Sequence, residues 1–256
     1  MRVLATYNIK GGVGKTATAV NLAFLSSAHG TRTLVWDLDP QGAASFYFRV
    51  RPRVKGGGRK LIRGQVDLEA RVKATDYPNL DLLPADFSYR HLDLDLDQWK
   101  NPLKRIGKIL EPISRGYDLI IIDCAPSISL VSESIFRAAD TLLVPTVPTP
   151  LSLRTLHQLL RALQEVRTKR LQVLPFFSMV DRRKALHRKT ADLVEEIPIP
   201  FLRTQIPYSS LVEQMGTRRA PLHSFTRSSK PAVAFEALWA EVMTWMEEGR
   251  GYRSGG

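Results

Sequence analysis

The stretch Lys10-Gly-Gly-Val-Gly-Lys-Thr16 stands between a short apolar run, Val3 to Tyr7, and a segment of helical period, Lys15 to Ala28. A strand that leads through a glycine-rich loop into a helix directs successive backbone N–H groups at one point in front of the helix. The positive end of the helix dipole lies at the same point, which favours phosphate groups. The stretch therefore predicts a phosphate-binding loop at the carboxyl end of the first strand.

The side chains of this loop indicate the nucleotide chemistry. Lys15 would neutralise the β- and γ-phosphates of ATP, and the hydroxyl of Thr16 would bind Mg²⁺. The strict form of the motif also requires glycine five residues before Gly14, where this chain has Ile9. The strict pattern therefore fails at one position. The predicted nucleotide-binding residues of the loop are Lys10, Gly11, Gly12, Val13, Gly14, Lys15, Thr16 and Ala17.

Short apolar runs alternate with longer segments of helical period along the chain. This alternation is typical of a doubly wound α/β fold, in which a mainly parallel sheet carries helices on both faces. A chain of 256 residues that is 44% hydrophobic is long enough for one such domain, which we assign to residues 1–250. The predicted strands are Val3–Tyr7, Thr33–Trp36, Leu80–Leu83, Leu119–Ile122, Thr141–Val144, Val173–Ser178 and Phe201–Thr204. The predicted helices are Lys15–Ala28, Asp67–Ala74, Leu103–Ile113, Leu130–Ala138, Leu151–Val166, Lys184–Glu196, Ser210–Met215 and Ala232–Glu248.

Two segments break the alternation. Residues 49–60 combine five arginines and lysines before Lys60 with three consecutive glycines, so we expect an exposed, mobile loop and no packed element there. Residues 251–256 are rich in glycine and end the chain, and we expect them to form a disordered tail.

The overall charge of the chain is strongly positive and indicates which kinds of molecule it would attract. Lys and Arg number 37 against 25 Asp and Glu, and the resulting charge of +12 predicts attraction to nucleic acid or to an anionic membrane surface. The single cysteine, Cys124, allows neither an internal disulfide nor a paired metal motif, which favours a reducing cytoplasm. No apolar run reaches the roughly 18 residues of a membrane span. The loop begins at residue 10, so we expect neither a signal peptide nor an operator-binding extension ahead of it.

Carboxylates stand at the ends of two further strands. Asp37 and Asp39 close the second strand, and side chains two residues apart on extended backbone point the same way, here toward the phosphates at the carboxyl edge of the sheet. Asp123 follows the apolar run Leu119 to Ile122. An acid in that place, after a phosphate-binding loop, is the Walker B arrangement that holds Mg²⁺ through a water.

The loop resembles the deviant Walker A motif of the ParA/MinD family of P-loop ATPases, because every position of the consensus Lys-Gly-Gly-x-Gly-Lys-[Ser/Thr] is matched. The resemblance implies that Lys10 reaches across an ATP-sandwiched dimer to the phosphates bound by the partner. The run Trp-Asp37-Leu-Asp39-Pro-Gln-Gly42 resembles the switch I segment of the same family. This implies that Asp39 orients the attacking water and that Asp37 contributes to the magnesium shell. On this resemblance the catalytic residues are Lys10, Lys15 and Asp39, and the metal residues are Thr16, Asp37, Asp39 and Asp123.

The resemblance covers nearly the whole chain apart from residues 49–60, and it is strongest for ParA-type partition and cargo-positioning members. Val144-Pro-Thr-Val-Pro148 and Thr204-Gln-Ile-Pro-Tyr208 are segments that look like this branch. By family position, the residues expected round the adenine are Met179, Asp181 and Pro207.

Other branches of the superfamily fit less well. Members that assemble iron–sulfur clusters or reduce nitrogenase need paired cysteines, which this chain lacks. Members of the MinD type bind membranes through a basic amphipathic C-terminal helix. Between Ala232 and Glu248 the charged residues are all acidic, so we expect no stable membrane anchoring and expect Phe235 and Trp239 to lie in the core.

Two basic clusters in the C-terminal half are the candidates for DNA binding. If they meet on one face, an ATP-bound dimer would track DNA phosphates without reading bases, as ParA relatives do. The predicted DNA-binding residues are Arg182, Arg183, Lys184, Arg188, Lys189, Arg218, Arg219 and Lys230.

The sequence thus predicts a ParA-like ATPase of the cytoplasm and nucleoid. ATP with Mg²⁺ would close a homodimer that binds nucleoid DNA, and a ParB-like or cargo-adaptor protein would stimulate hydrolysis and release. Two alternatives stay open at this point. One is a MinD-like ATPase that cycles on and off a membrane. The other is a small-molecule synthetase of the dethiobiotin or cobyrinate type, which shares the P-loop architecture.

Overall fold

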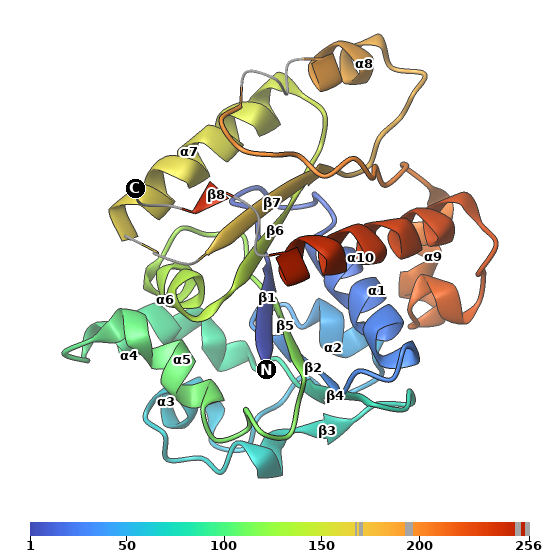
Figure 1. Ribbon diagram of the computed structural model, residues 1–256. Coiled ribbons are helices and arrows are strands. Elements are labelled where there is room, and N and C mark those ends of the chain that lie inside the picture. Colours follow the sequence, from blue (N-terminus) through green and yellow to red (C-terminus); the bar gives the residue numbers. More distant parts are fainter. Residues whose placement is uncertain (167, 169–170, 193–196, 249–251, 254–256) are drawn as a thin grey trace.

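The first strand runs through the middle of a single sheet (Figure 1). The computed structural model describes residues 1–166, 168, 171–192, 197–248 and 252–253, within which eight strands pair in the order β3-β4-β2-β5-β1-β6-β7-β8. The six inner strands are parallel, and the two-residue edge strands β3 and β8 are antiparallel to their neighbours. The strands are β1 Arg2–Thr6, β2 Thr33–Asp37, β3 Lys73–Ala74, β4 Leu80–Leu83, β5 Leu119–Asp123, β6 Thr141–Thr146, β7 Gln172–Phe177 and β8 Tyr252–Arg253.

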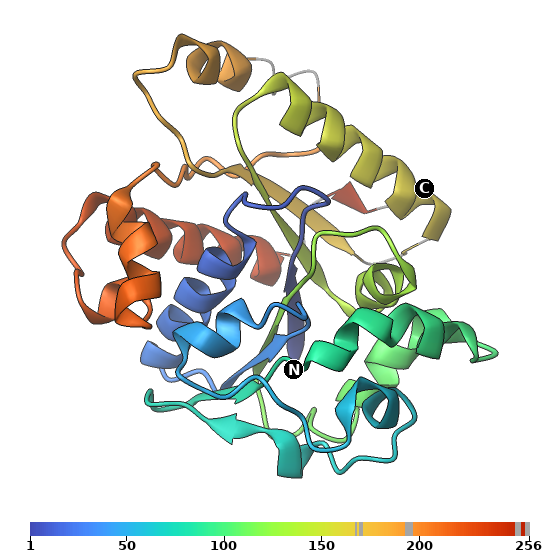
Figure 2. The ribbon, with the colours of Figure 1, turned by 180° about the vertical axis from the view of Figure 1, so that it is seen from behind.

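Helices cover both faces of the sheet (Figures 1 and 2). Short 3₁₀ turns at Glu69–Arg71, Phe87–His91, Pro102–Lys104 and Leu222–Ser224 join some of them. The helices are α1 Lys15–Ala28, α2 Ala43–Tyr47, α3 Gly57–Ile62, α4 Leu92–Asp97, α5 Arg105–Leu110, α6 Leu130–Ala138, α7 Pro150–Val166, α8 Ala185–Asp192, α9 Ser210–Arg218 and α10 Lys230–Glu248.

The alternation of side chains along the inner strands divides the core in two. Leu4 and Ile121 enter one core, together with residues of α1, α2, α9 and α10. Their chain neighbours Ala5 and Ile122 enter the other, together with residues of α3 to α7. Because both faces of a parallel sheet are buried, its strands are continuously apolar. The predicted doubly wound α/β fold is therefore confirmed, and α1 and α6 have the predicted bounds.

Two predicted elements are wrong. Phe201 to Thr204 is not a strand, because the backbone N–H groups of Arg203 and Thr204 donate to the carboxylate of Glu241 on α10 instead of to a neighbouring strand. Asp67 to Ala74 is not a helix. It contains one 3₁₀ turn and then strand β3, whose residues pair with Asp81 and Leu82 of β4.

Residues 49–60, named here the basic segment, also differ from the predicted mobile loop. From Gly57 on they form the start of helix α3, and Val54, which precedes the helix, is only 3% exposed. The glycines allow this packing. A Cβ added to Gly58 would lie 2.7 Å from Leu92 Cδ2 and 2.9 Å from Tyr89 Cδ1. A glycine run that suggests a loop can thus be the point where a helix packs most closely.

Two predicted segments fall partly outside the described residues. Of the predicted tail over 251–256, Tyr252 and Arg253 form strand β8 against the start of β7, and residues 251 and 254–256 lie outside the description. Helix α8 is described from Ala185 to Asp192, and residues 193–196 of the predicted helix lie outside.

The close packing of Gly58 leads to a stability prediction. We expect Gly58→Ala to lower the free energy of unfolding by about 1–2 kcal/mol, because the new methyl group overpacks the contact with Leu92 and Tyr89. Gly107→Ala is the matched control in α5, where an added Cβ meets only Ala138 Cβ at 3.9 Å. It should raise the free energy by about 0.5–1 kcal/mol through helix propensity. Urea unfolding of both variants measures the difference, and equal effects would show that Gly58 is not tightly packed.

Candidate functional site

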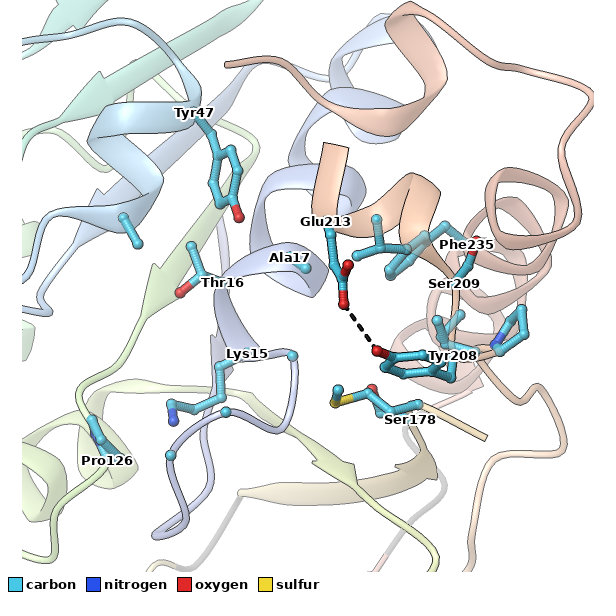
Figure 3. Close-up of a pocket in the computed structure, with 18 of the residues that line it drawn as sticks. Lys15, Thr16, Ala17, Tyr47, Pro126, Ser178, Tyr208, Ser209, Glu213 and Phe235 are labelled. Atoms are coloured by element: carbon cyan, nitrogen blue, oxygen red, sulfur yellow. Dashed lines mark hydrogen bonds between the residues drawn. The ribbon is translucent and has the colours of Figure 1, made fainter. Parts of the chain in front are cut away.

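The glycine-rich loop between β1 and α1 forms one wall of a pocket at the carboxyl edge of the sheet (Figure 3). Gly12 and Gly14 have φ angles of 70° and 93°, which residues with a Cβ avoid. A Cβ added to Gly14 would lie 2.9 Å from Ser178 Oγ, whereas one added to Gly11 or Gly12 would meet nothing within 4 Å. The loop is therefore in close contact with Ser178 at Gly14 and has free space at Gly11 and Gly12, where phosphate groups could approach the backbone.

Lys15 is the cation of this pocket. Its side chain points along the loop, and its Nζ donates to the backbone carbonyl of Lys10 at 3.2 Å (Figure 3). Only 7% of the residue is exposed. Burial lowers the pKa of Lys15, and the nearby carboxylate of Asp123 opposes that shift. A partly dehydrated ammonium of this kind gains more from a phosphate group than one in open water would.

Lys10 is placed differently. Its backbone N–H donates to Asn8 Oδ1 at 2.9 Å, and Asn8 is itself held by a hydrogen bond from its Nδ2 to the carbonyl of Pro145 at 2.9 Å. Lys10 does not line the pocket, although Gly11 and Lys15, which follow it in the loop, do. The two lysines of the motif thus have different surroundings within one chain.

Two carboxylates are buried side by side behind the loop. Asp37 and Asp123 end β2 and β5 in direct register, and both are 0% exposed. Asp37 Oδ2 accepts hydrogen bonds from the N–H and Oγ of Ser45, each at 2.7 Å. Asp123 Oδ1 accepts a long bond from Thr6 Oγ1 at 3.4 Å. The second oxygen of each carboxylate is buried without a hydrogen-bond partner among the described residues.

This arrangement shifts both pKa values upward. Burial raises the pKa of Asp37 to about 6, against the lowering effect of Ser45. Burial, and then the negative charge of Asp37, raise the pKa of Asp123 well above its usual range, and a hydrogen bond from Thr16 opposes the shift. Two buried carboxylates with unpaired oxygens favour a cation between themselves and the pocket.

The side chains fit Mg²⁺ held jointly with a nucleotide. Thr16 and Asp39 line the pocket, and the hydroxyl of Thr16 is near enough to the Asp123 carboxylate to lower its pKa. No group of three or more His, Cys, Asp or Glu residues able to hold a metal alone occurs in the described chain. Mg²⁺ commonly takes one or two protein oxygens, with phosphates and waters completing the shell. The Thr16 hydroxyl and the two unpaired carboxylate oxygens could supply these few protein oxygens, directly or through water.

Asp37 and Asp39 do not face the pocket together. Asp39 lies past the strand end, lines the pocket, and accepts the N–H of Gln41 at 2.9 Å. Asp37 is still within β2 and points at Ser45. The predicted i, i+2 alignment required extended backbone through Asp39, but β2 ends at Asp37. Of the two, only Asp39 is placed to contact a nucleotide directly.

The far end of the pocket is apolar and aromatic. Met179, with φ of 56°, and Pro207 line it, and a bridge between Val180 and Pro207 brings their segments together. The pocket volume is about 380 Å³, within the range of small-molecule sites. Asp181, the third predicted adenine residue, does not line the pocket. Its carboxylate pairs with the Arg183 guanidinium at 3.0 Å, which lowers the pKa of Asp181 to about 2.

Several residues that line the pocket were not predicted from the sequence, among them Tyr208, Glu213 and Phe235. Tyr208 lies over the apolar end, and its hydroxyl donates to Glu213 Oε1 at 3.0 Å (Figure 3). Phe235 reaches the same end from α10. Tyr208 follows Pro207 directly, so its position could have been inferred. Glu213 and Phe235 come from helices with no recognisable motif, and only the packing of α9 and α10 on α1 brings them to the nucleotide loop.

The predicted basic clusters lie on separate parts of the molecule. Helix α8, with the first cluster, stands apart from the end of α9, with Arg218 and Arg219, in both views (Figures 1 and 2). Arg218 stacks on the ring of Phe225, with its guanidinium carbon 4.9 Å from the ring centre. Arg219 stacks on Phe46 of α2 instead of meeting α8. The side chain of Arg188 lies outside the described part of the structure.

The C-terminal helix α10 is packed into the second core. Phe235 and Trp239 are 1% and 6% exposed, so the expectation that they are core residues is confirmed. In the described parts of the chain, no helix combines the length and the apolar character that crossing a bilayer requires.

Comparison with known sequences gives one family model and several related proteins. A family model for an AAA domain matches residues 1–175. The chromosome partitioning protein ParA of Caulobacter vibrioides is 34% identical over 198 residues, which cover 75% of this chain and 74% of that protein. The sporulation initiation inhibitor protein Soj of Bacillus subtilis is 29% identical over 250 residues, which cover 94% of this chain and 98% of that protein.

Solved structures extend the comparison to the fold. Cobyrinic acid a,c-diamide synthase from Mycobacterium smegmatis, with ADP and magnesium bound, is 27% identical with a TM-score of 0.82, covering 97% of this chain and 96% of that one. The cell division ATPase MinD of Pyrococcus furiosus shares the fold, with a TM-score of 0.75 at 22% identity over 95% and 98% of the two chains.

The buried carboxylate pair generates a prediction that requires no assay of turnover. Asp123→Asn should raise the free energy of unfolding of the nucleotide-free protein by about 1–2 kcal/mol, because it removes an unpaired buried charge beside Asp37. The same change should reduce the stabilisation that Mg²⁺ with ATP confers. Urea unfolding with and without Mg²⁺ and ATP measures both effects.

Asp118→Asn is the matched control for that experiment, since its carboxylate is half exposed and paired with Arg32 at 2.9 Å. It should change neither quantity by more than about 1 kcal/mol. A nucleotide-free Asp123→Asn protein less stable than the parent would contradict the proposed repulsion.

Proposed function

Since this chain belongs to the ParA/MinD family of P-loop ATPases, we propose that it is a ParA-like ATPase that works as an ATP-sandwich dimer on nucleoid DNA. The chain hydrolyses ATP to ADP and phosphate, with ATP and Mg²⁺ as its nucleotide and metal. The dimer, the DNA and the cargo are the parts that we propose.

The observation that carries the proposal is the placement of the two motif lysines. Lys15 lies in the pocket of its own chain, whereas Lys10 does not line that pocket. A lysine that belongs to the phosphate-binding loop but does not line the pocket of its own chain is available to the phosphates bound by a second chain. Lys10 then adds positive charge at the γ-phosphate only when the dimer has formed. Hydrolysis is thereby coupled to association.

Within the site each residue has a defined task. The loop N–H groups and Lys15 hold the phosphates, and Asp39 positions the attacking water. Mg²⁺ supplies charge neutralisation at the β- and γ-phosphates, and Thr16, Asp37, Asp39 and Asp123 are the residues that would hold it directly or through water. Met179 and Pro207 enclose the base. Phosphoryl transfer depends mostly on such positioning and charge.

The proposed cycle ends with release from DNA. The ATP-bound dimer binds duplex DNA through the phosphate backbone, with no base readout, using the basic clusters of Arg182 to Lys189 and of Arg218 to Lys230. A ParB-like or cargo-adaptor protein stimulates hydrolysis, and the dimer dissociates. A cargo such as a chromosome region, a plasmid or a protein assembly then follows the gradient of bound protein. This places the protein in the cytoplasm, on the nucleoid.

A second candidate is a small-molecule synthetase. It is favoured by the similarity to the cobyrinic acid a,c-diamide synthase structure, which extends over nearly both chains. ATP turnover that requires a small carboxylic substrate and ignores DNA would support it over the positioning ATPase. A MinD-like membrane cycle has less support, because Phe235 and Trp239 of α10 are buried in the core instead of free to anchor a membrane helix.

Substitution of the two lysines separates their tasks. Lys15→Ala should abolish nucleotide binding, because Lys15 is the one cation that lines the pocket among the described residues. Lys10→Ala should bind ATP within about threefold of the parent but fail to dimerise. A fluorescent ATP analogue measures binding, and light scattering after gel filtration measures the dimer. If Lys10→Ala dimerises normally with ATP, its proposed role across the dimer is wrong.

Substitution of Asp39 tests the hydrolytic step. Asp39→Ala should bind ATP and dimerise but lose hydrolysis by at least about a hundredfold, since nothing then orients the water. The dimer should stay on DNA, which retention on a DNA-coated surface in ATP would measure. Gln41→Ala, in the same turn, serves as the control and should hydrolyse ATP. Normal turnover by Asp39→Ala would refute this assignment.

A further inference from the structure

The surface of residues 49–64 is made of very few residue types. Its apolar side chains Val54, Leu61 and Ile62 are buried, and Val50 is half-buried. The segment contains no acidic residue. The exposed residues are Arg49, Arg51, Pro52, Arg53, Lys55, Gly56, Arg59, Lys60, Arg63 and Gly64. The exposed side chains of residues 49–64 are therefore cations, and the one apolar side chain among them is Pro52.

The backbone of the segment is anchored at three points. The N–H of Val54 donates to Asp86 Oδ2 at 2.8 Å, and the N–H of Gly58 donates to Ser88 Oγ at 2.7 Å. At the end of α3, Arg105 Nε donates to the carbonyl of Ile62. Cations on an anchored backbone lose less conformational freedom when they bind a ligand than cations on a loose chain do.

The segment also rests on the region that follows Asp39. A Cβ added to Gly42 would lie 3.0 Å from Pro52 Cβ, so the segments that contain these two residues are in close contact. Next to this contact, the N–H of Ala85 donates to Ser45 Oγ at 2.9 Å, and Ser45 is the partner of Asp37. The same short stretch, Gly42 to Ser45, therefore contacts both the basic segment and the buried Asp37 behind the nucleotide pocket.

The charge of the segment is only partly balanced. Arg49 pairs with Asp76 at 2.9 Å, and Arg59 approaches Asp95 at 3.5 Å. Arg53 interacts at longer range with Asp86. Arg51, Lys55 and Lys60 have no acidic partner within the part of the chain that the structure describes.

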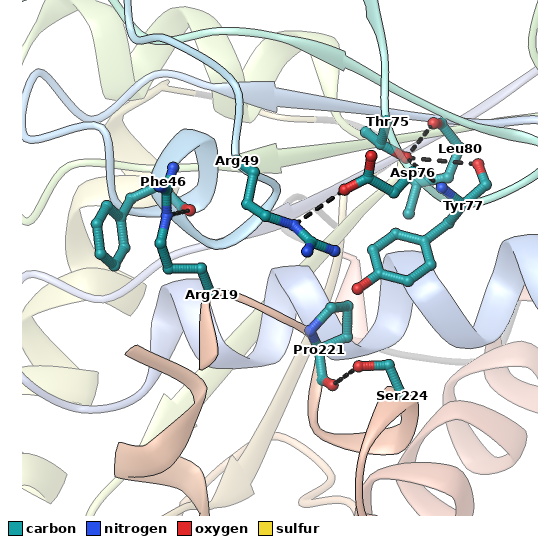
Figure 4. A network of polar contacts seen from close by, with 9 residues as sticks. All are labelled: Phe46, Arg49, Thr75, Asp76, Tyr77, Leu80, Arg219, Pro221 and Ser224. Carbon is teal, nitrogen blue, oxygen red and sulfur yellow. Dashed lines mark hydrogen bonds and ion pairs between the residues drawn. The ribbon is translucent and has the colours of Figure 1, made fainter. Parts of the chain in front are cut away.

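The segment adjoins one of the two C-terminal clusters (Figure 4). The carbonyl of Phe46 accepts hydrogen bonds from the N–H of Arg49 at 3.1 Å and from Nε of Arg219 at 3.2 Å. The Arg219 guanidinium also lies 4.7 Å from the centre of the Phe46 ring. The basic residues at the end of α9 thus continue across α2 into the basic segment, and not toward α8.

We propose that Arg51, Arg53, Lys55, Arg59, Lys60 and Arg63, named here the α3 platform, bind the phosphate backbone of duplex DNA. DNA phosphates need only positioned cations. Protein partners usually require an exposed apolar or aromatic anchor, and stable membrane docking usually adds apolar side chains that insert. None of the six platform residues is apolar, and the exposed aromatic residues nearby, Phe46 and Phe87, lie outside the platform. The inference rests on the proposed DNA binding and adds a surface to it that neither C-terminal cluster contains.

The test compares three variants that each lose three positive charges. The platform variant is Arg51→Gln with Arg53→Gln and Lys55→Gln. The α8 variant is Arg182→Gln with Arg183→Gln and Lys184→Gln. The control is Arg115→Gln with Arg137→Gln and Arg161→Gln, whose parent residues are exposed and lie outside both surfaces. Fluorescence anisotropy of a random-sequence duplex is followed against salt, with Mg²⁺ and a non-hydrolysable ATP analogue. Thermal unfolding checks that each variant is folded.

The platform variant should bind at least about tenfold more weakly than the control, and the slope of log affinity against log salt should fall by about 2–3. If it matches the control while the α8 variant loses affinity, the platform is wrong and the proposed DNA binding stands. If the parent protein binds no duplex, both fail. Binding to phosphatidylserine vesicles through the platform, without duplex binding, would overturn the inference in favour of a membrane surface.

Discussion

The burial of two carboxylates beside a buried ammonium is the constraint on which the rest of this structure depends. Asp37 and Asp123 end neighbouring strands in register, and Lys15 opens the helix in front of them. Burial raises the pKa of both acids and lowers the pKa of the lysine, so each charge is unfavourable until a partner arrives. A nucleotide with Mg²⁺ supplies a negative and a positive charge together. The fold therefore holds a site whose own charges favour that ligand.

The same constraint connects the pocket to its surroundings. Asp37 is held by Ser45, Ser45 is held to Ala85, and Asp86 anchors Val54 of the basic segment. On the other side of the pocket, the α9 helix that supplies Glu213 ends at Arg218, and the next residue, Arg219, stacks on Phe46. Few hydrogen bonds and ring contacts thus join the residues around the pocket to the residues that carry the surface charge. If nucleotide binding changes the affinity for DNA, these contacts are the ones that would transmit the change.

Sequence patterns predicted most of the fold and of the phosphate end of the site. The loop from Lys10 to Thr16, the strand ends at Asp37 and Asp123, and the bounds of α1 follow from local chemistry, because glycine geometry and apolar period act over a few residues. The base end was harder. Glu213 and Phe235 reach the pocket through helix packing, and Asp181 turns to Arg183 instead. The glycines at 56–58 suggested a loop, but Gly58 permits close packing against Tyr89 and Leu92. Tertiary contacts decided each of these cases.

A complementation assay tests the central claim, that each site is completed by Lys10 of a second chain. In a mixed dimer of Lys10→Ala and Asp39→Ala chains, the site on the Lys10→Ala chain has its own Asp39 and would receive Lys10 from the other chain. Each variant alone should be inactive, and an equimolar mixture should recover measurable ATPase activity, because every mixed dimer receives Lys10 from its Asp39→Ala chain and so contains one complete site. A mixture as inactive as its components would contradict the account and would indicate that Lys10 acts on the nucleotide bound by its own chain.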